Sequence, residues 1–386
     1  MSLTEIGVVG GGQLGRMLLL EGLKSGRTFS VLDPSPDAPA AALAQCFVEG
    51  RFTDETAIRR LAASAERLTF EFEHIDAKTL MKLDAPAGKV MPSPETLYMI
   101  QDKFRQKSFL RSRGIPVPDF LQVDSLVEAE EAGEILGFPF MLKSRAGGYD
   151  GKGNALVNRR EDVGKAMTSL GGENAGLMAE KHMEFLMEIS VVTARDKAGN
   201  LAVFPVGQNI HRNSILHRTL VPAPLPDRVI HEAKELAMET MTQLKGAGIF
   251  CIEMFVDKRF QLTINEMAPR THNSGHHTIE SCTISQFGQQ VRTLMGWPLA
   301  QPELHSPAVM VNLLGDPRQS GKPVLKGITK AMALGKVMPH LYGKAESRPG
   351  RKMGHVTILG KTLDEAVKTA DRVEECLYVE VIPSIR

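Results

Sequence analysis

The segment from Ile249 to His277 constrains the fold more than any other part of the chain. It reads as two apolar strands joined by a short charged turn at 257–259, which predicts a β-hairpin. Glu253 lies in the first strand, and Asn265 and Glu266 close the second. Acidic residues are depleted in strands and rarely buried unpaired, and facing residues of a hairpin lie about 5 Å apart. These acids therefore require a compensating charge.

One or two Mg²⁺ ions are one source of that charge. Hard cations take carboxylate and amide oxygens, and Mg²⁺ shares such ligands with nucleotide phosphates. The alternative is that the acids cap the strand ends and pair with Lys or Arg. The hairpin alone does not decide between these two interpretations.

The composition is that of an ordinary globular chain. Its 386 residues allow two or three domains, and its net charge of +1 gives no indication of nucleic acid or an anionic membrane as the main partner. The four cysteines are scattered without a CxxC pair, which favours a reducing compartment over a disulfide framework or a zinc site. Because we find no signal-peptide pattern and no apolar run that could span a bilayer, we expect a cytoplasmic protein.

Strand and helix patterns alternate over residues 5–100, which predicts a parallel sheet with helices on its faces. One helix is expected from Ser93 to Arg113, followed by a small α/β unit over 119–190. An amphipathic helix at 229–244 precedes the hairpin, and strands with one helix at 363–376 end the chain.

A first glycine cluster lies between a predicted strand and a predicted helix. Gly10, Gly12 and Gly15 fit the GxGxxG pattern, and Asp33 ends the next strand. Bare amides at a helix N-terminus favour a phosphate group. A nicotinamide cofactor, as in an NAD-dependent oxidoreductase, and a tight turn without any ligand are both alternatives.

A second glycine cluster follows the apolar strand that carries Lys143. Four glycines within the seven residues 147–153 form no stable regular element. A lysine that leaves an apolar strand before a flexible basic loop predicts a phosphate clamp with a lid. The alternative is an exposed hairpin turn with a snorkelling lysine, but such a turn needs only one or two glycines.

Two further polar segments carry candidate binding groups. The polar run from Arg270 to His277 follows the hairpin directly and suggests an anion pocket beside the metal. Its histidines lack the cysteine partners and spacing of a zinc site. The backbone of 179–183 is suited to an adenine edge, and a carboxylate such as Glu188 to ribose hydroxyls, but the alternative is that each of these residues is an ordinary surface charge. Neither a GxSxG motif nor a Walker-type loop occurs.

Together these features resemble the ATP-grasp superfamily. The motifs GGGQLGRM, TFEFEHI, KSRAGGYDGKG, INEMAPRTHNSGHHT and RPGRKMGHV are similar to those of the N5-carboxyaminoimidazole ribonucleotide synthetase family, and they occur in order between residues 10 and 356. The resemblance implies an α/β and α+β ATP-grasp fold. Its parts would be a Rossmann-like N-terminal domain (1–100), an ATP-grasp domain (101–300) with a lid (about 119–190), and a C-terminal domain (301–386) that completes the ligand site.

The resemblance also implies a reaction. ATP and bicarbonate would form carboxyphosphate, which would carboxylate 5-aminoimidazole ribonucleotide in de novo purine biosynthesis and leave ADP and phosphate. Alternatives are another ATP-grasp ligase, such as a formate-dependent phosphoribosyl enzyme or a biotin carboxylase, or a non-catalytic ATP sensor. The resemblance further implies a homodimer, and fusion to or cooperation with an N5-carboxyaminoimidazole ribonucleotide mutase.

The resemblance assigns a role to each matching residue. The metal ligands would be Glu253 and Glu266. The catalytic residues would be Lys143, Asp150, Arg270 and Lys352. ATP would contact Lys103, Lys143, Gly148, Tyr149, Asp150, Gly151, Lys152, Gly153, Asn154, Glu180, Lys181, His182, Met183, Glu188, His211, Asn265 and Glu266. The ribonucleotide and bicarbonate would contact Gly12, Gln13, Leu14, Glu73, Tyr149, Asp150, Arg270, His272, Asn273, Ser274, Lys344, Arg351 and Lys352.

Overall fold

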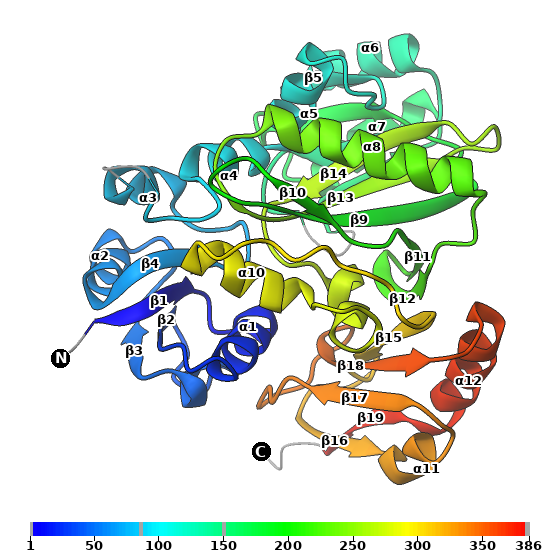
Figure 1. Ribbon diagram of the computed structural model, residues 1–386. Coiled ribbons are helices and arrows are strands. Elements are labelled where there is room, and N and C mark those ends of the chain that lie inside the picture. Colours follow the sequence, from blue (N-terminus) through cyan, green and yellow to red (C-terminus); the bar gives the residue numbers. More distant parts are fainter. Residues whose placement is uncertain (1–2, 85–87, 149–151, 383–386) are drawn as a thin grey trace.

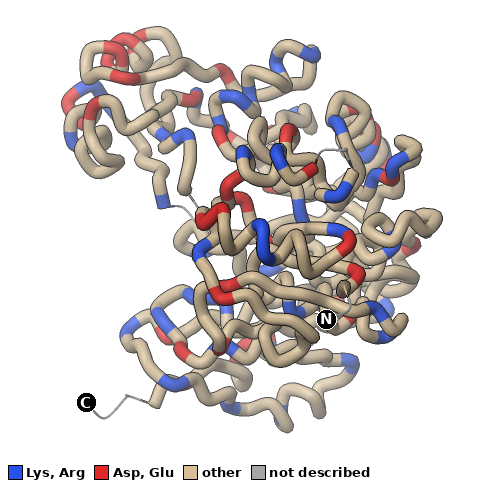
Figure 2. The backbone as a smooth tube through the Cα atoms, turned by 90° about the vertical axis from the view of Figure 1, so that its left-hand side faces the viewer, with Lys and Arg blue, Asp and Glu red and all other residues tan. Residues whose placement is uncertain are grey.

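A computed structural model describes residues 3–84, 88–148 and 152–382 of the protein (Figure 1). Basic and acidic residues are interspersed along the whole tube in Figure 2, in keeping with the net charge of +1. No helix among the described residues is both long enough and apolar enough to cross a membrane.

The N-terminal region is a parallel sheet with helices on its faces, which confirms the prediction from strand–helix alternation. Its strand order is β3-β2-β1-β4, and β1, whose residues from Ile6 to Val9 are buried, lies inside the sheet. Its elements are β1 (Thr4–Val9), α1 (Gln13–Leu23), β2 (Phe29–Asp33), η1 (Ala41–Leu43), β3 (Cys46–Glu49), α2 (Glu55–Ser64), β4 (Ala65–Phe70), α3 (Ala77–Leu83) and α4 (Pro94–Ile100).

The glycine-rich N-terminus of α1 is closed by a carboxylate of the protein itself. Glu71 accepts hydrogen bonds from the backbone N–H groups of Gly12, at 2.5 Å, and Gly15, at 2.7 Å. Asp33 accepts from the N–H groups of Gly11 and Ser35, both at 2.9 Å. The amides that the GxGxxG pattern offers to a phosphate are therefore already satisfied internally.

The helix predicted from Ser93 to Arg113 is wrong as a single element, because the structure divides it in two. The first part, α4, ends at Ile100, and α5 (Lys103–Ser112) begins after a break. Asp102 caps α5 by accepting hydrogen bonds from the N–H groups of Phe104 and Arg105. An aspartate at this position offers the backbone an alternative to continuous helix.

The lid is a small antiparallel sheet of order β5-β8-β6-β7, with two helices packed on it through a shared apolar core. It lies at the top of Figure 1 and occupies the region predicted as an α/β unit. Its elements are β5 (Phe120–Val123), α6 (Leu126–Leu136), β6 (Phe140–Ser144), β7 (Asn154–Val157), η2 (Arg160–Asp162), α7 (Val163–Ser169) and β8 (Leu177–Lys181).

A large antiparallel sheet forms the centre of the molecule, in the order β14-β13-β9-β11-β12-β15-β18-β17, with β10 paired to β9. The predicted hairpin is confirmed as β13 and β14, and Glu253 lies directly opposite Glu266. Helix α8 packs on the sheet, and α10 lies between this sheet and the N-terminal region (Figure 1). The elements here are β9 (Met187–Arg195), β10 (Leu201–Val203), β11 (Gly207–Arg212), β12 (Ile215–Val221), α8 (Asp227–Gln243), β13 (Gly248–Val256), β14 (Leu262–Ala268), η3 (Asn273–His277), α9 (Thr278–Ser281) and α10 (Gln286–Met295).

The C-terminal region continues this central sheet, because β12 pairs with β15 over Arg218 to Val221. Helix α12 is fixed against β12 by ion pairs from Arg218 to Asp371, at 2.7 Å, and to Glu374, at 2.5 Å. The last elements are β15 (Ala308–Leu314), β16 (Lys322–Lys326), α11 (Ile328–Met332), β17 (Val337–Leu341), β18 (Lys352–Leu359), α12 (Leu363–Cys376) and β19 (Tyr378–Ile382).

We expect Glu71→Ala to lower the free energy of unfolding by about 1–3 kcal/mol, because two N–H groups at the start of α1 lose their acceptor. Urea denaturation measures this loss. Sulfate should restore part of it, since the vacated helix N-terminus becomes an anion site. The control is Glu66→Ala, on the strand β4 that directly precedes Glu71; the Glu66 side chain is 52% exposed. Equal stability of the two variants would contradict the assigned role of Glu71.

Candidate active site

A cleft of about 1050 Å³ opens between the lid, the central sheet, the N-terminus of α1 and the loop around 344–352. It collects most of the site residues that the sequence predicts, from all three parts of the chain. The predicted residues that line it are Gly12, Gln13, Leu14, Glu73, Lys103, Lys143, Gly148, Lys152, Asn154, Glu180, Lys181, His182, Met183, Glu188, His211, Glu253, Asn265, Glu266, Arg270, His272, Asn273, Lys344, Arg351 and Lys352.

A few predicted residues fall elsewhere. Gly153 is not among the lining residues, although its carbonyl accepts a hydrogen bond from the Ser144 N–H and so closes the glycine loop. Ser274 is buried behind the wall of the cleft, where its hydroxyl bonds to Ser190 at 2.8 Å. Tyr149, Asp150 and Gly151 lie outside the described residues.

The two strand acids face each other on the floor of the cleft. Burial, and then the nearby charge of Glu266, raise the pKa of Glu253 to about 8. The Nζ of Lys103 lies 2.5 Å from a carboxylate oxygen of Glu266, and the positive charge of this lysine lowers the pKa of Glu266 to about 2. The pair therefore has one strongly ionised member and one that resists ionisation, because like charges on facing strand positions repel.

This pair suits a divalent cation, since a cation between the carboxylates would relieve their repulsion. The Asn265 side chain lines the cleft beside them and offers an amide oxygen. Among the described residues, no three His, Cys, Asp or Glu side chains are grouped so that they could hold a metal ion by themselves. An ion here would need oxygens from a ligand as well, as Mg²⁺ does with nucleotide phosphates.

A second set of charges lies where the lid meets the central sheet. Glu180, on β8, is 2% exposed and pairs with both Lys143, on β6, and Lys107, on α5. Burial alone would raise the pKa of Glu180, but the two lysines together lower it, so the carboxylate stays ionised. Since the lysines already occupy this carboxylate, the groups available to contact a base here are the backbone of 180–183 and its other side chains, which line the cleft.

Polar and aromatic side chains suit the rest of a nucleotide. His211 Nδ1 lies 3.0 Å from a Glu188 carboxylate oxygen. Burial opposes the charged imidazole, but Glu188 outweighs it and raises the pKa of His211. The Phe185 and Phe255 rings stack at 4.7 Å with an interplanar angle of 12° and line the same end of the cleft as the backbone of 180–183. The sequence analysis did not identify these two rings, which are 70 residues apart in the sequence.

Basic groups gather at the opposite end of the cleft. Lys344 Nζ donates to Gln13 Oε1 at 2.9 Å and to the Lys352 carbonyl at 2.6 Å, which joins the C-terminal loop to the start of α1. Arg351 donates to the Glu346 carbonyl at 2.8 Å and lines the cleft together with Arg348. This arrangement of cations suits an anionic group such as a phosphate.

The polar segment after β14 joins these two ends. Arg270 Nε lies 2.9 Å from a Glu73 carboxylate oxygen. His272 Nδ1 accepts from the Ser274 N–H at 3.3 Å, so its Nε2 faces Glu253 at 3.8 Å. Within the described residues, neither polar atom of the buried Asn273 amide has a hydrogen-bond partner. Buried amides are normally satisfied, so Asn273 is suited to receive a ligand or water.

The sequence analysis missed several charged residues of the site. Glu71 caps α1, Arg145 forms an ion pair with Asp102 at 2.7 Å, and Lys107 reaches Glu180. A signal existed for Lys107 alone, since Lys103 and Lys107 are four residues apart and share a face of α5. The partners of the others are distant in the sequence, so no local pattern indicates them.

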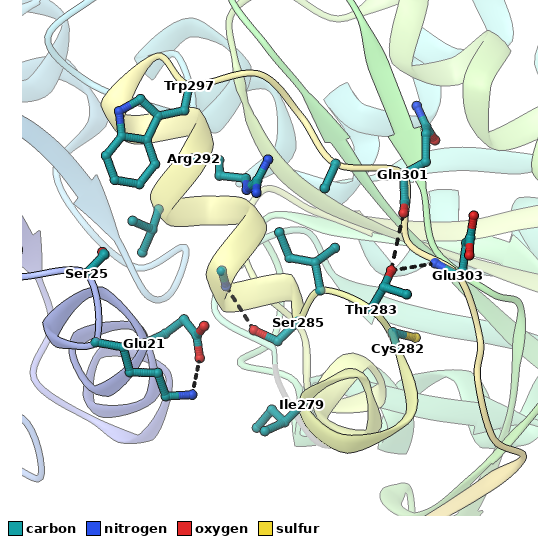
Figure 3. Close-up of a pocket in the computed structure, with 15 residues that line it drawn as sticks. Glu21, Ser25, Ile279, Cys282, Thr283, Ser285, Arg292, Trp297, Gln301 and Glu303 are labelled. Carbon is teal, nitrogen blue, oxygen red and sulfur yellow. Dashed lines mark hydrogen bonds and ion pairs between the residues drawn. The ribbon is translucent and has the colours of Figure 1, made fainter.

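A smaller pocket of about 680 Å³ lies away from this cleft, between α1 and α10 (Figure 3). Its polar groups are largely engaged with one another: Glu21 with Lys24, Ser285 with the Gly288 N–H, and Thr283 with the backbone of the 301–303 segment. None of the predicted site residues lines this pocket.

The internal capping of α1 argues against the NAD alternative. A pyrophosphate at this helix N-terminus would have to displace the buried Glu71 carboxylate. The acid at the end of β2, Asp33, is likewise engaged by two backbone N–H groups and is not free to bind a ribose. The GxGxxG segment therefore serves to orient α1, which carries Gln13 into the cleft.

Comparison with known proteins gives matches to families along most of the chain. The ribonucleotide synthetase preATP-grasp domain matches residues 3–101, the ATP-grasp domain matches 108–287, and the phosphoribosylaminoimidazole carboxylase C-terminal domain matches 308–369.

Individual proteins match over nearly the full length. An N5-carboxyaminoimidazole ribonucleotide synthase from Staphylococcus aureus is 36% identical over 94% of both chains. A phosphoribosylaminoimidazole carboxylase from Ogataea methanolica is 37% identical over 97% of this chain, which spans 70% of that longer protein.

Two solved structures have the same fold. The N5-carboxyaminoimidazole ribonucleotide synthetase of Thermotoga maritima superposes with a TM-score of 0.90 at 40% identity, covering 98% of this chain and all of that one. The enzyme of Aspergillus clavatus, in complex with ADP and 5-aminoimidazole ribonucleotide, gives a TM-score of 0.89 at 32% identity, covering 97% of this chain and 98% of that one.

We expect Glu253→Gln to stabilise the protein at alkaline pH in the absence of ligands. Between the ordinary carboxyl pKa of 4.5 and the raised value of about 8, the folded protein retains a proton that the unfolded chain has released. Stability therefore falls as pH rises through this window, and glutamine removes that loss. Thermal melts in metal-free buffer should show a higher melting temperature for the variant at pH 8, and a smaller difference at pH 5.

The control for this experiment is Glu232→Gln, on the surface of α8, whose side chain is 41% exposed. It should not change the pH dependence. A Glu253→Gln variant that melts below the wild type at both pH values would contradict the conclusion that the ionised Glu253 carboxylate destabilises the folded protein.

Proposed function

This chain belongs to the N5-carboxyaminoimidazole ribonucleotide synthase family of ATP-grasp ligases, and we propose that its cleft carries out the family reaction. The protein catalyses ATP-dependent carboxylation of 5-aminoimidazole ribonucleotide to N5-carboxyaminoimidazole ribonucleotide, a step of purine biosynthesis. One observation supports this assignment most directly: Lys143, Glu253 and Glu266 converge in one cleft, opposite the basic loop at 348–352.

We propose that ATP binds at the junction of the lid and the central sheet. The segment 180–183, which we call the hinge because it leads from the lid strand β8 toward the central sheet, would contact the adenine edge through its backbone, beside Phe185 and Phe255. Glu188 and His211 would hold the ribose hydroxyls, and Lys143 and Lys103 would face the phosphates. Gly148, Lys152 and Asn154, from the glycine loop and its flanks, line the cleft, and this loop would cover the phosphates.

Glu253, Glu266 and Asn265 would hold one or two Mg²⁺ ions together with phosphate oxygens. When bound, Mg²⁺ supplies positive charge that offsets charge on the phosphoryl oxygens. The short contact between Lys103 and Glu266 means that this lysine competes with the ion for the same carboxylate. Binding of the nucleotide would release Lys103 toward the phosphates.

The ribonucleotide would occupy the end of the cleft formed by Gln13, Glu73 and the C-terminal loop. Its phosphate would lie among Lys344, Arg351 and Lys352, which are held in place from α1 and by the loop backbone. Arg270, His272 and Asn273 lie between this end and the acid pair, where bicarbonate has to meet both substrates.

The reaction proceeds in two steps that conserve all atoms. A bicarbonate oxygen attacks the γ-phosphorus of ATP, ADP leaves, and carboxyphosphate forms. The exocyclic amine of the ribonucleotide then forms a bond to the carboxyl carbon, either of carboxyphosphate or of CO₂ released from it, and phosphate leaves. Lys143 and Lys103 stabilise the phosphoryl charge, and either Asp150 or a phosphate oxygen takes the amine proton.

The reaction also requires that water is excluded from the cleft, since water hydrolyses carboxyphosphate. The glycine loop and the lid would provide this cover on one side, and Arg270 with its Glu73 partner on the other.

We further propose that the protein is cytoplasmic, forms a homodimer, and cooperates with a mutase that consumes its product. Light scattering on the purified chain measures the oligomeric state.

A panel of substrates tests the proposed function. ADP release, followed by a coupled assay, should require both bicarbonate and 5-aminoimidazole ribonucleotide. Glu266→Gln should lower kcat by at least about 100-fold, because the acid pair loses the charge that attracts the ion. The control is Glu232→Gln, which should retain full activity. ADP release at the same rate without the ribonucleotide would contradict the assignment.

We expect Arg351→Gln to raise the KM for the ribonucleotide by about 10- to 150-fold and leave the KM for ATP within about twofold, since one charge-assisted contact to phosphate contributes about 1.5–3 kcal/mol. Steady-state kinetics with each substrate varied in turn measure both constants. The control, Arg318→Gln, removes an arginine that is 79% exposed. An equal rise in both KM values would place Arg351 outside the ribonucleotide end.

A further inference from the structure

Lys107 lies beside the cleft, and the proposed reaction does not use it. It is 2% exposed and, unlike Lys103 and Lys143, does not line the cleft. A buried lysine is rare unless it is paired, because removing an ammonium group from water costs several kcal/mol. The burial of the Lys107 ammonium group therefore requires a specific explanation.

Lys107 makes two polar contacts that join separate parts of the fold. Its Nζ lies 2.8 Å from Glu180 Oε2 on the lid strand β8. The same atom donates a hydrogen bond of 2.7 Å to the carbonyl of Asn265, the residue before the acid Glu266 on β14. One ammonium group on α5 thus connects the hinge of the lid to the strand of the acid pair.

The contact with Glu180 is shared. Lys143 bonds to the other oxygen of the same carboxylate, so two lysines neutralise one buried acid. In the proposed function Lys143 must turn toward the phosphates of ATP. Without a second cation, that movement would leave the Glu180 carboxylate buried and unpaired, at a cost of several kcal/mol.

We propose that Lys107 is a positioning residue that serves as the permanent counter-ion of Glu180 and thereby frees Lys143 to bind nucleotide phosphate. This role rests on the proposed function. Lys107 keeps the buried carboxylate neutralised whether or not ATP is present, while Lys143 exchanges between the carboxylate and the phosphates. If Lys107 were only a packing element, removing the charge of Glu180 could not compensate for its loss.

The test is a double-mutant cycle on the full chain, with ADP and ATP affinity measured by calorimetry in the presence of Mg²⁺. Lys107→Met keeps the length of the side chain and removes its charge. We expect it to weaken nucleotide binding by at least tenfold, since Lys143 becomes the sole counter-ion of Glu180. In steady-state kinetics the KM for ATP should rise while kcat changes less than about threefold, because Lys107 does not touch the reacting atoms.

The double variant, Lys107→Met with Glu180→Gln, distinguishes a counter-ion role of Lys107 from simple packing. In Lys107→Met with Glu180→Gln, no buried carboxylate holds Lys143, so nucleotide affinity should return to within about threefold of the Glu180→Gln single variant. Lys107→Arg, which keeps the charge, should also retain more affinity than Lys107→Met. The control is Lys89→Met, which removes a lysine bonded to the Ala62 carbonyl outside the cleft and should bind nucleotide as the wild type does.

The results of these binding measurements distinguish failure of the proposed function from failure of the role assigned to Lys107. If the wild type binds no nucleotide, the proposed function fails and this role with it. If the wild type binds but Lys107→Met binds equally well, the role of Lys107 is wrong and the function stands. If Lys107→Met does not fold, the comparison of Glu180→Gln with the double variant decides, and a double variant at least tenfold weaker overturns the proposal.

Discussion

The geometry of the cleft depends on one buried carboxylate, that of Glu180. It lies where the lid meets the central sheet, and its two lysine partners come from β6 and α5. A buried ion pair contributes little to net stability compared with well-packed apolar groups, yet breaking it from one side is strongly destabilising. The contacts of Glu180 therefore specify an arrangement more than they add stability. They place Lys143, the strand of the acid pair and the hinge backbone at fixed positions around one site.

The pair of Glu253 and Glu266 differs from Glu180, because repulsion between its two carboxylates is unfavourable in the protein without ligand. Glu253 and Glu266 face each other because a hairpin register imposes it, and the apolar residues around them give no relief. The raised pKa of Glu253 records an unfavourable charge in the absence of ligand. Functional sites commonly retain such strain, since the group that destabilises the empty fold is the one that binds the missing partner. In the proposed function, that partner is a cation together with the phosphates it carries.

Local patterns in the sequence were sufficient for much of the fold and the site. The hairpin, the parallel N-terminal sheet and the lysine strand before the glycine loop each follow from a short segment, whereas the basic C-terminal loop was assigned to the site only through the family resemblance. The break between α4 and α5 was missed, because helical apolar spacing continues across Asp102 while only its capping contacts reveal the end. Glu71 and Lys107 were missed for another reason. Their partners lie more than 50 residues away in the sequence, so their contacts depend on the tertiary structure, although the spacing of Lys103 and Lys107 indicates a shared helix face.

The pairing of β12 with β15 has a consequence for catalysis. It makes the hairpin that carries the two acids and the loop that carries the basic residues parts of one continuous sheet. In the proposed function, the span between the ATP end and the ribonucleotide end is then set by hydrogen-bonded strands, whose spacing of nearly 5 Å scarcely stretches. A short-lived intermediate made at one end must cross that span before it decomposes. Because the span is built into the sheet, lid movement can change how well the intermediate is shielded but not how far it must travel.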